Sequence, residues 1–260
     1  MAKQFTDQMN NTIRLEEFPC RIVSLVPSQT ELLYDLGLGD KVVGITKFCI
    51  HPESWFKSKP RVGGTKQLNI DVIRSLNPDL IIGNKEENTK GDIELLQKIA
   101  PVWMSDISTL EESYEMINQL GTLTNSSISA NQLVTEIKQE FSKIEPSRSN
   151  KSVLYFIWKN PCFVAGTNTF INSIISELGF ENFCQEERYP ELKNNSESYP
   201  DYIFLSSEPY PFKKGDVIEI EQQFPHSTVV IVDGEMFSWY GSRLKYAPNY
   251  FIELIQQLTY

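Results

Sequence analysis

The sequence predicts an α/β protein made of two similar units, each a parallel sheet covered by helices. Three kinds of segment carry this prediction, because they occur twice in the same order. The first is a strand, turn and helix that ends at a Leu-Gly pair. The second is a Pro-Asp pair before an apolar strand, and the third is a closing apolar strand. The paired segments are 22–44 and 152–184, 77–82 and 199–204, and 101–104 and 229–232. Strands that alternate with helices are typical of parallel sheets.

The first half has four apolar runs bounded by turn residues, which predict strands, and periodic segments between them, which predict helices. We expect strands at 22–26, 42–46, 79–83 and 101–104, and helices near 29–36, 70–75, 91–99 and 110–121. Residues 1–20 are polar and are predicted to form an irregular arm.

The most regular helical pattern of the chain follows this half. Leu133, Ile137, Phe141 and Ile144 recur at helical spacing in 126–146, and Pro146 ends the pattern. A helix between two α/β units is a stiff connector, unlike a flexible Gly/Ser linker. The predicted fold is therefore two Rossmann-like lobes with parallel sheets, joined by one long rigid helix.

The second half repeats the alternation of strands and helices. Strands are expected near 152–158, 162–165, 202–206 and 228–232, and helices near 168–178, 216–222 and 247–258, with 185–199 as a loop or broken helix. The domain boundaries follow: an arm at 1–20, an N-terminal lobe at 21–125, the linking helix at 126–147 and a C-terminal lobe at 148–260. We expect a ligand cleft between the lobes, where small molecules commonly bind.

Composition and charge exclude several classes of function. The 260 residues are 40% hydrophobic and 22% charged, and the net charge is −10. A nucleic-acid-binding protein needs a positive surface, and anionic membrane surfaces also repel such a chain. No apolar run reaches the roughly 18 residues of a membrane span. The start lacks a signal peptide and a lipid-modified Cys, so the chain is expected in the cytoplasm as written, or in the periplasm if an export signal was removed.

No recognised catalytic motif is present. The Gly37-Leu38-Gly39 run follows a helix, whereas a dinucleotide fingerprint lies between strand and helix. With two histidines, a three-histidine metal site is impossible. The alternative of an enzyme would have to use Cys49, His51 and Glu31, and we expect no catalytic cofactor and no catalysis.

Several residues are candidates for binding a ligand. Ser28 is placed to cap a helix that begins at the end of a strand, next to Gln29, and residues 166–169 repeat this arrangement in the second half. Helix starts of this kind hold acceptor groups or negative charge. Arg243 could pair with a carboxylate, amide or phosphate of a ligand, or form an ion pair at the protein surface. Aromatic residues in predicted loops and strand ends could line a large flat ligand: Phe48, Trp158, Phe163, Tyr189, Tyr210, Phe212, Phe237, Trp239 and Tyr240.

The chain resembles the class III substrate-binding proteins of ABC importers, which serve uptake of vitamin B12, haem and iron–siderophores. The resemblance begins near Arg21 and is carried by 21–31, with Val26-Pro27-Ser28, and by Val62-Gly63-Gly64, Asn69-Ile70-Asp71, 77–82 and 160–166. It implies two lobes bridged by a long helix, with the ligand between aromatic and polar loops.

The resemblance also implies roles for single residues. Phe48 falls at the position of a pocket tyrosine in B12-binding members, and Phe163 and Tyr189 fall at aromatic wall positions of the second lobe. Thr65 and Asn84 each stand where those members have a pocket tryptophan. Asp71 falls where the family has an acidic residue that docks on the importer. His51 lies in a segment that aligns with the pocket wall, and its imidazole is a candidate axial ligand to the metal of a bound chelate.

The predicted function is non-catalytic binding of a metal chelate, with cobalamin or another corrinoid as the leading candidate. Haem or a ferric siderophore is the alternative, although siderophores call for more basic residues than Lys47, Lys159 and Arg243. An ABC importer permease is the expected partner. We expect a monomer that binds no nucleic acid and does not insert into a membrane.

Overall fold

The computed structural model describes residues 2–147, 150–192 and 199–259, which form two compact units. Unit 1 comprises Met1–Asp106, Glu111–Lys138 and Tyr240–Arg243; unit 2 comprises Ile107–Leu110, Gln139–Trp239 and Leu244–Tyr260. The chain therefore returns to unit 1 after most of unit 2 has been built.

A parallel sheet forms the centre of unit 1. Its strands are β3 (Ile22–Ser24), β4 (Val42–Ile45), β7 (Leu80–Asn84) and β8 (Val102–Ser105), in the order β4-β3-β7-β8. The central strands β3 and β7 are buried along their whole length, which is why they read as continuous apolar runs in the sequence. All four lie at the predicted positions.

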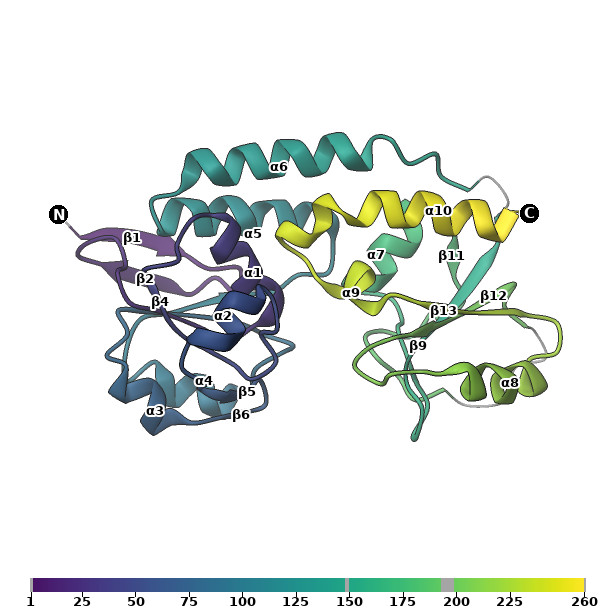
Figure 1. Ribbon diagram of the computed structural model, residues 1–260, viewed down its shortest axis with the longest axis horizontal. Helices are drawn as coiled ribbons and strands as arrows, with labels where there is room; N and C mark the ends of the chain where they lie inside the picture. Colours follow the sequence, from purple (N-terminus) through teal and green to yellow (C-terminus); the bar gives the residue numbers. More distant parts are fainter. Residues whose placement is uncertain (1, 148–149, 193–198, 260) are drawn as a thin grey trace. The chain divides into compact units, whose positions relative to one another are not determined.

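Helices cover both faces of this sheet, with α3 and α4 on one side and α5 on the other (Figure 1). Their bounds are α1 (Pro27–Asp35), α2 (Glu53–Ser58), α3 (Ile70–Ser75), α4 (Lys90–Leu96), α5 (Leu110–Leu123) and α6 (Ser127–Phe141). Ile73 of α3 and Leu96 of α4 pack with the sheet residues Val23 and Ile81 in one buried cluster. Short strands β5 (Gly63–Gly64) and β6 (Gln67–Leu68) pair antiparallel beside them.

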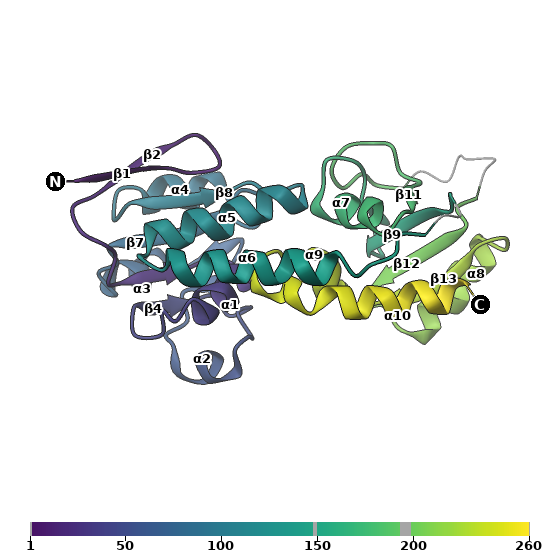
Figure 2. The ribbon, with the colours of Figure 1, turned by 90° about the horizontal axis from the view of Figure 1, so that it is seen from above.

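Helices α5 and α6 lie side by side in both views (Figures 1 and 2). A Cβ on Gly121 would collide with the Ala130 side chain, so glycine permits this close approach. Helix α6 ends at Phe141, earlier than the predicted end of the linking helix, because a turn follows at 142–143. Its residues up to Lys138 belong to unit 1 and the rest to unit 2.

The first residues form a hairpin, so the prediction of an irregular arm was wrong. Strands β1 (Lys3–Thr6) and β2 (Thr12–Leu15) pair antiparallel. Ile13 and Leu15 alternate with exposed residues and are buried. The Asp7 carboxylate accepts hydrogen bonds from the backbone N–H groups of Met9 and Asn11 and so stabilises the turn.

Unit 2 has a sheet with the same parallel order. Strands β11 (Glu181–Asn182), β9 (Ser152–Trp158), β12 (Tyr202–Ser206) and β13 (Thr228–Val232) are parallel, and β10 (Phe163–Val164) adds an antiparallel pairing at the end of β9. Strand β11 takes the place that β4 has in unit 1, and the other three correspond in turn to β3, β7 and β8.

The two Pro-Asp pairs have matching roles in this duplication. Asp79 accepts hydrogen bonds from the N–H groups of Cys20 and Arg21, immediately before β3. Asp201 accepts one from the N–H of Ser152, the first residue of β9. Each carboxylate thus binds the start of the first strand of its own sheet, which explains why the pair occurs twice in the sequence.

Helices of unit 2 pack on its sheet through aromatic residues. They are α7 (Phe170–Glu177), α8 (Lys214–Gln223), α9 (Gly234–Ser238) and α10 (Ala247–Thr259). A 3₁₀ turn at Ser242–Lys245 begins in unit 1 and ends in unit 2. Phe237 of α9 lies 5.1 Å from the Tyr155 ring and 5.0 Å from that of Phe251. On the other side, Ile220 of α8 joins Phe156 in a separate cluster.

The predicted fold class is confirmed: both units are α/β and both sheets are parallel apart from β10. The sequence did not predict the short helices α2 and α9 or the two-residue strand β11. Within the described residues, no helix combines the length and apolar character needed to cross a membrane.

Candidate functional site

The carboxyl edge of the unit 1 sheet carries an exposed aromatic side chain. Phe48 follows β4 and is 51% exposed. The Lys47 ammonium lies 5.0 Å from the centre of its ring. A Cβ on Gly64 would lie 3.1 Å from Phe48 Cε2, so the absence of a side chain there makes room for the ring. Phe48 is therefore exposed at this edge, and its part in binding a ligand stays a prediction.

A buried polar network lies behind this edge. Asn88 Nδ2 donates to the Thr65 carbonyl at 3.1 Å, and its Oδ1 accepts from the Asn84 N–H at 2.9 Å. Burial raises the pKa of Glu87, and this outweighs the opposing effects of Lys66 and a hydrogen bond with Thr65. Thr65 and Asn84 thus bind neighbouring loops together and are themselves buried.

The start of helix α1 differs from the prediction. The N-cap position is Val26, with Pro27 as the first helical residue, and no side chain caps the helix. Proline suits that position because its missing N–H would have no partner in the helix. The prediction that Ser28 caps α1 was therefore wrong, because Ser28 lies inside the first turn.

Gln29 lies in the same turn and is fully buried. Its Nε2 donates to Ser105 Oγ at 2.5 Å, and Asn84 Nδ2 donates to the same oxygen at 3.0 Å. Among the residues that the structure describes, none forms a hydrogen bond with Gln29 Oε1. These side chains join the ends of β7 and β8 to α1 and shape the edge from within.

The candidate catalytic groups are engaged in other interactions. The Cys49 sulfur lies 3.1 Å from both Thr30 Oγ1 and Thr46 Oγ1, and burial raises the pKa of its thiol. A raised pKa makes a thiol less nucleophilic. The Glu31 carboxylate is bound by Arg243. His51 is partly buried, between Cys49 and the start of α2.

Aromatic residues also gather at the carboxyl edge of the unit 2 sheet. Trp158, the last residue of β9, is 40% exposed. Its ring lies 5.6 Å from that of Tyr210, which in turn lies 4.7 Å from Phe212. Phe163 pairs with Trp158 across β9 and β10 and is partly buried. We call Trp158, Phe163 and Tyr210 the unit 2 aromatic group.

The start of helix α7 is capped by a side chain of the turn that precedes it. Thr169 is the N-cap of α7, and its Oγ1 accepts from the Asn172 N–H at 3.1 Å. The Gly166 N–H donates to the Arg188 carbonyl at 2.8 Å. Tyr189 follows Arg188 and is partly buried.

Phe237 and Trp239, which were predicted to line the ligand site, are buried. Phe237 is in the aromatic core of unit 2. Trp239 Nε1 donates to Glu208 Oε1 at 2.7 Å. Burial raises the pKa of the Glu208 carboxyl, although hydrogen bonds from Trp239 and Ser238 oppose this. Tyr240, in unit 1, is also buried.

Two of the three basic candidates are neutralised. Arg243 donates from Nε and Nη2 to the Glu31 carboxylate at 2.9 and 2.7 Å, so the ion-pair alternative for this residue is observed. Lys159 Nζ lies 2.7 Å from Asp216 and 2.6 Å from Glu219. Of the three, Lys47 is exposed and has no carboxylate partner in the described part of the chain.

Asp71 lies in the first turn of α3 and is exposed, with an ion pair of 2.8 Å to Arg74. Its exposure leaves it accessible to a partner protein. Among the described residues, no group of three or more His, Cys, Asp or Glu side chains could hold a metal ion.

Comparison with known proteins assigns the chain to a family. Residues 22–223 match the family model for a periplasmic binding protein. The chain belongs to the periplasmic binding protein family. This confirms the family resemblance stated from the sequence.

Two curated relatives of this periplasmic binding protein are informative. It is 26% identical over 251 residues to the vitamin B12-binding protein of Pectobacterium carotovorum, covering 93% of the chain and 89% of that protein. It is 29% identical over 192 residues to an ABC transporter substrate-binding lipoprotein of Bacillus subtilis, covering 70% of the chain and 60% of the relative. The second alignment thus spans about three fifths of the lipoprotein.

A solved structure agrees over nearly the whole chain. The crystal structure of a possible iron-binding, periplasmic solute-binding protein from Staphylococcus epidermidis has 25% identity and a TM-score of 0.77, and covers 94% of this chain and 100% of that one. The similarity includes both units of this periplasmic binding protein.

Sequence reasoning left some residues out of the candidate site. Tyr210 was noted as a loop aromatic, but its packing on Trp158 depends on strands far apart in the chain. Glu87 and Glu208 were not considered, because an isolated Glu in a polar loop gives no sign that it will be buried.

Proposed function

We propose that the chain is a non-catalytic binding protein for a metal chelate of low negative charge, with cobalamin or another corrinoid as the first candidate. Phe48 in unit 1 and the unit 2 aromatic group supply apolar contact surface. Large flat ligands gain most of their affinity from such contacts. The similarity to a vitamin B12-binding protein supports this choice.

One observation carries the ligand class: of the three basic candidates, Arg243 and Lys159 are each bound by carboxylates of the protein itself, which leaves Lys47 alone without a carboxylate partner among the described residues. A ferric siderophore or the propionates of haem would need unpaired cations to replace their hydration. The carboxyls of Glu87 and Glu208 lie near the same sheet edges of their units and add no positive charge. A neutral or cationic chelate therefore fits better than a polyanion.

We also propose that an ABC importer permease is the partner and that Asp71 takes part in docking. Asp71 is exposed on α3, where a carboxylate can pair with a basic group of another protein. In this role the protein delivers its ligand outside the cytoplasm and performs no chemistry on it.

Titration of the purified protein with aquocobalamin, haemin and a ferric catecholate siderophore tests the proposal. Calorimetry is expected to show one corrinoid bound per chain and much weaker binding of the two anionic chelates. The visible spectrum of the corrinoid is expected to shift on binding. Tight haemin binding without corrinoid binding would refute the assignment of the ligand. Absence of binding to all three would refute the wider class.

A further inference from the structure

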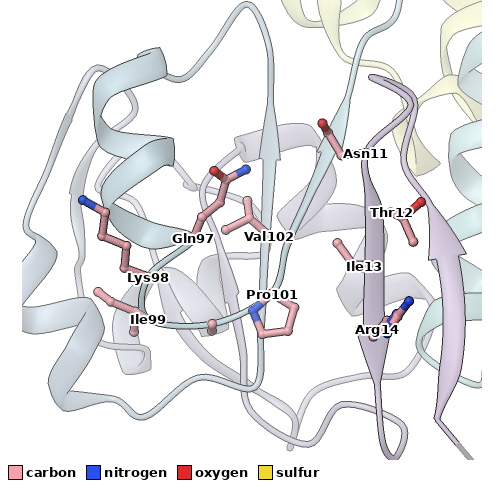
Figure 3. Close-up of a pocket in the computed structure, with 10 residues that line it drawn as sticks. Asn11, Thr12, Ile13, Arg14, Gln97, Lys98, Ile99, Pro101 and Val102 are labelled. Atoms are coloured by element: carbon pink, nitrogen blue, oxygen red, sulfur yellow. The ribbon is translucent and has the colours of Figure 1, made fainter.

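A groove of about 500 Å³ runs between strand β2 and the segment that leads into β8 (Figure 3). Asn11, Thr12, Ile13 and Arg14 line one side, and residues 97–102 line the other. A second cavity of about 340 Å³ adjoins it, sharing Lys98 and Ile99. Both cavities lie within unit 1, at the amino ends of its parallel strands, and so at the opposite edge from Phe48.

In the described part of the chain, the hydrogen bonds between the hairpin and β8 lie at one end of the groove. The Gln8 N–H donates to the Met104 carbonyl at 3.1 Å, and the Met104 N–H donates to Asp7 Oδ2 at 3.3 Å. Within the described residues, strands β2 and β8 form no ladder with each other, and β8 is the edge strand of its sheet. Away from Met104, the two strands are separated by the groove.

The β8 side of the groove has unpaired backbone groups. The Ile81 N–H donates to the Pro101 carbonyl at 2.9 Å, and Ile81 is in register with Val102. Because backbone groups alternate in direction along a strand, the N–H and C=O of Val102 point away from β7. Neither group forms a hydrogen bond among the described residues.

The β2 side presents the same feature. The Asp7 N–H donates to the Asn11 carbonyl at 2.9 Å, and Thr6 is in register with Thr12. The same alternation turns the N–H and C=O groups of Thr12 and Arg14 away from β1. The groove therefore lies between two strand edges with unpaired hydrogen-bonding groups, exposed at Thr12 and Arg14 and largely covered at Val102, which is 3% exposed. Strand edges with unpaired groups can accept another strand.

The charge of the groove is opposite to that of the protein. Arg14, Lys98 and Arg74 are among the lining residues of the two cavities, which include no Asp or Glu, whereas the whole chain has a net charge of −10. Arg74 is paired with Asp71, but the Arg14 and Lys98 side chains are exposed and form no ion pair within the described part of the chain.

We propose that this groove binds an extended, acidic peptide segment of a partner protein, which adds as a strand to the open edges of β2 and β8. Main-chain hydrogen bonds to Val102, Thr12 and Arg14 hold the segment, and its carboxylates pair with the Arg14 and Lys98 side chains. This site is separate from the proposed chelate site and does not depend on it.

Fluorescence anisotropy with labelled hexapeptides tests the proposal. A peptide of alternating Val and Glu is expected to bind, and the matching Val–Lys peptide is expected to bind at least about tenfold more weakly because its charge is reversed. A peptide in which proline replaces each Val keeps every Glu but loses three main-chain donors, and is also expected to bind at least about tenfold more weakly.

Variants locate the binding site. Arg14→Ala and Lys98→Ala are each expected to weaken binding about threefold, as for an exposed ion pair. Lys90→Ala removes an exposed cation of α4 outside the groove and is expected to change nothing. Hydrogen exchange of the Val102, Thr12 and Arg14 amides is expected to slow when the Val–Glu peptide binds.

Three outcomes would overturn the proposal. The first is the absence of Val–Glu binding at millimolar concentration. The second is equal binding of the proline peptide. The third is displacement of the Val–Glu peptide by an equal concentration of free glutamate, together with unchanged hydrogen exchange of the three amides when the peptide binds. That result would identify a simple anion site instead.

Discussion

Arg243 and Glu31 form a two-point ion pair across 212 residues of sequence, with Nε–Oε2 and Nη2–Oε1 distances of 2.9 and 2.7 Å. Their side chains are only 13% and 14% exposed. Gly241, with φ +118°, places the same segment against α1, where a Cβ would lie 3.2 Å from the Ser28 carbonyl oxygen. The pair therefore fastens residues 240–243 to the first helix of unit 1.

Loss of Glu31 is expected to destabilise the protein. Glu31→Ala should lower the free energy of unfolding by about 2 kcal/mol, because a hydrogen bond to a charged group contributes roughly 1.5–3 kcal/mol. Urea unfolding measures the change. The double variant Glu31→Ala/Arg243→Ala should lose less than the sum of the single variants, since neither charge is then left unpaired. Strict additivity would show that the pair contributes nothing by itself.

Trp158 is expected to contribute to ligand affinity but little to stability. Trp158→Ala should weaken aquocobalamin binding about tenfold, because covering an exposed aromatic surface contributes about 1–2 kcal/mol. Tyr199→Ala is the matched control: Tyr199 is also exposed, but it precedes β12 at the opposite edge of the same sheet. Equal losses of affinity in the two variants would argue against a ligand site at the carboxyl edge.

Phe48 provides the same test in unit 1. Phe48→Ala should reduce corrinoid affinity several-fold and leave the urea midpoint unchanged, since half of the side chain is exposed already. Phe56→Ala is the matched control, because Phe56 is an exposed phenylalanine of α2 that stacks on Arg61. The corrinoid affinity of this variant should match that of the unaltered protein. Calorimetric titration compares the two, and an unchanged affinity in Phe48→Ala would remove this residue from the site.

His51 is tested by spectroscopy rather than by affinity. If its imidazole binds cobalt, the visible bands of aquocobalamin shift on mixing with the unaltered protein, and the shift disappears in His51→Ala. Bands that stay at the positions of free aquocobalamin in the unaltered protein would exclude a cobalt–imidazole bond, whatever the affinity.

Stability is expected to fall in acid partly through Asp216. The hydrogen bond from Lys159, and a further one from the Lys213 N–H, hold the pKa of Asp216 below the ordinary aspartate value of 3.8, although burial opposes this. The folded state therefore binds fewer protons than the unfolded state near this pH. The contribution of Asp216 is complete above 3.8 and is lost as the pH falls further.

Urea unfolding of Asp216→Asn at several pH values measures this contribution. The difference in stability between the unaltered protein and the variant should be largest near neutral pH and should shrink below pH 3.8. A difference that stays constant across this range would show that the carboxylate charge is not responsible.

The strands could be predicted because their residues are apolar throughout. Val23 and Ile81 are buried on central parallel strands, so burial on both faces leaves an unbroken apolar run. The hairpin at the start was missed because β1 is almost entirely exposed and reads as polar loop. The Ser28 cap failed because Pro27 already occupies the first helical position.

The candidate site was only partly accessible to sequence reasoning. Exposed aromatics such as Phe48 and Trp158 could be proposed from their position after strands. The burial of Phe237 and Trp239 depends on α9 packing against the sheet of unit 2, and the partner of Arg243 lies in the first helix. Such long-range pairings leave no pattern in the neighbouring sequence. They determine which basic side chains remain without a carboxylate partner and can therefore bind a ligand.

The return of the chain to unit 1 sets an order on its completion during synthesis. Every strand of both sheets has been translated before Arg243 is made. Until then, Glu31 has no guanidinium to neutralise it, and unit 1 lacks its last four residues. A ribosome that stops after β13 would therefore release a chain with both sheets encoded and the first unit still unfinished.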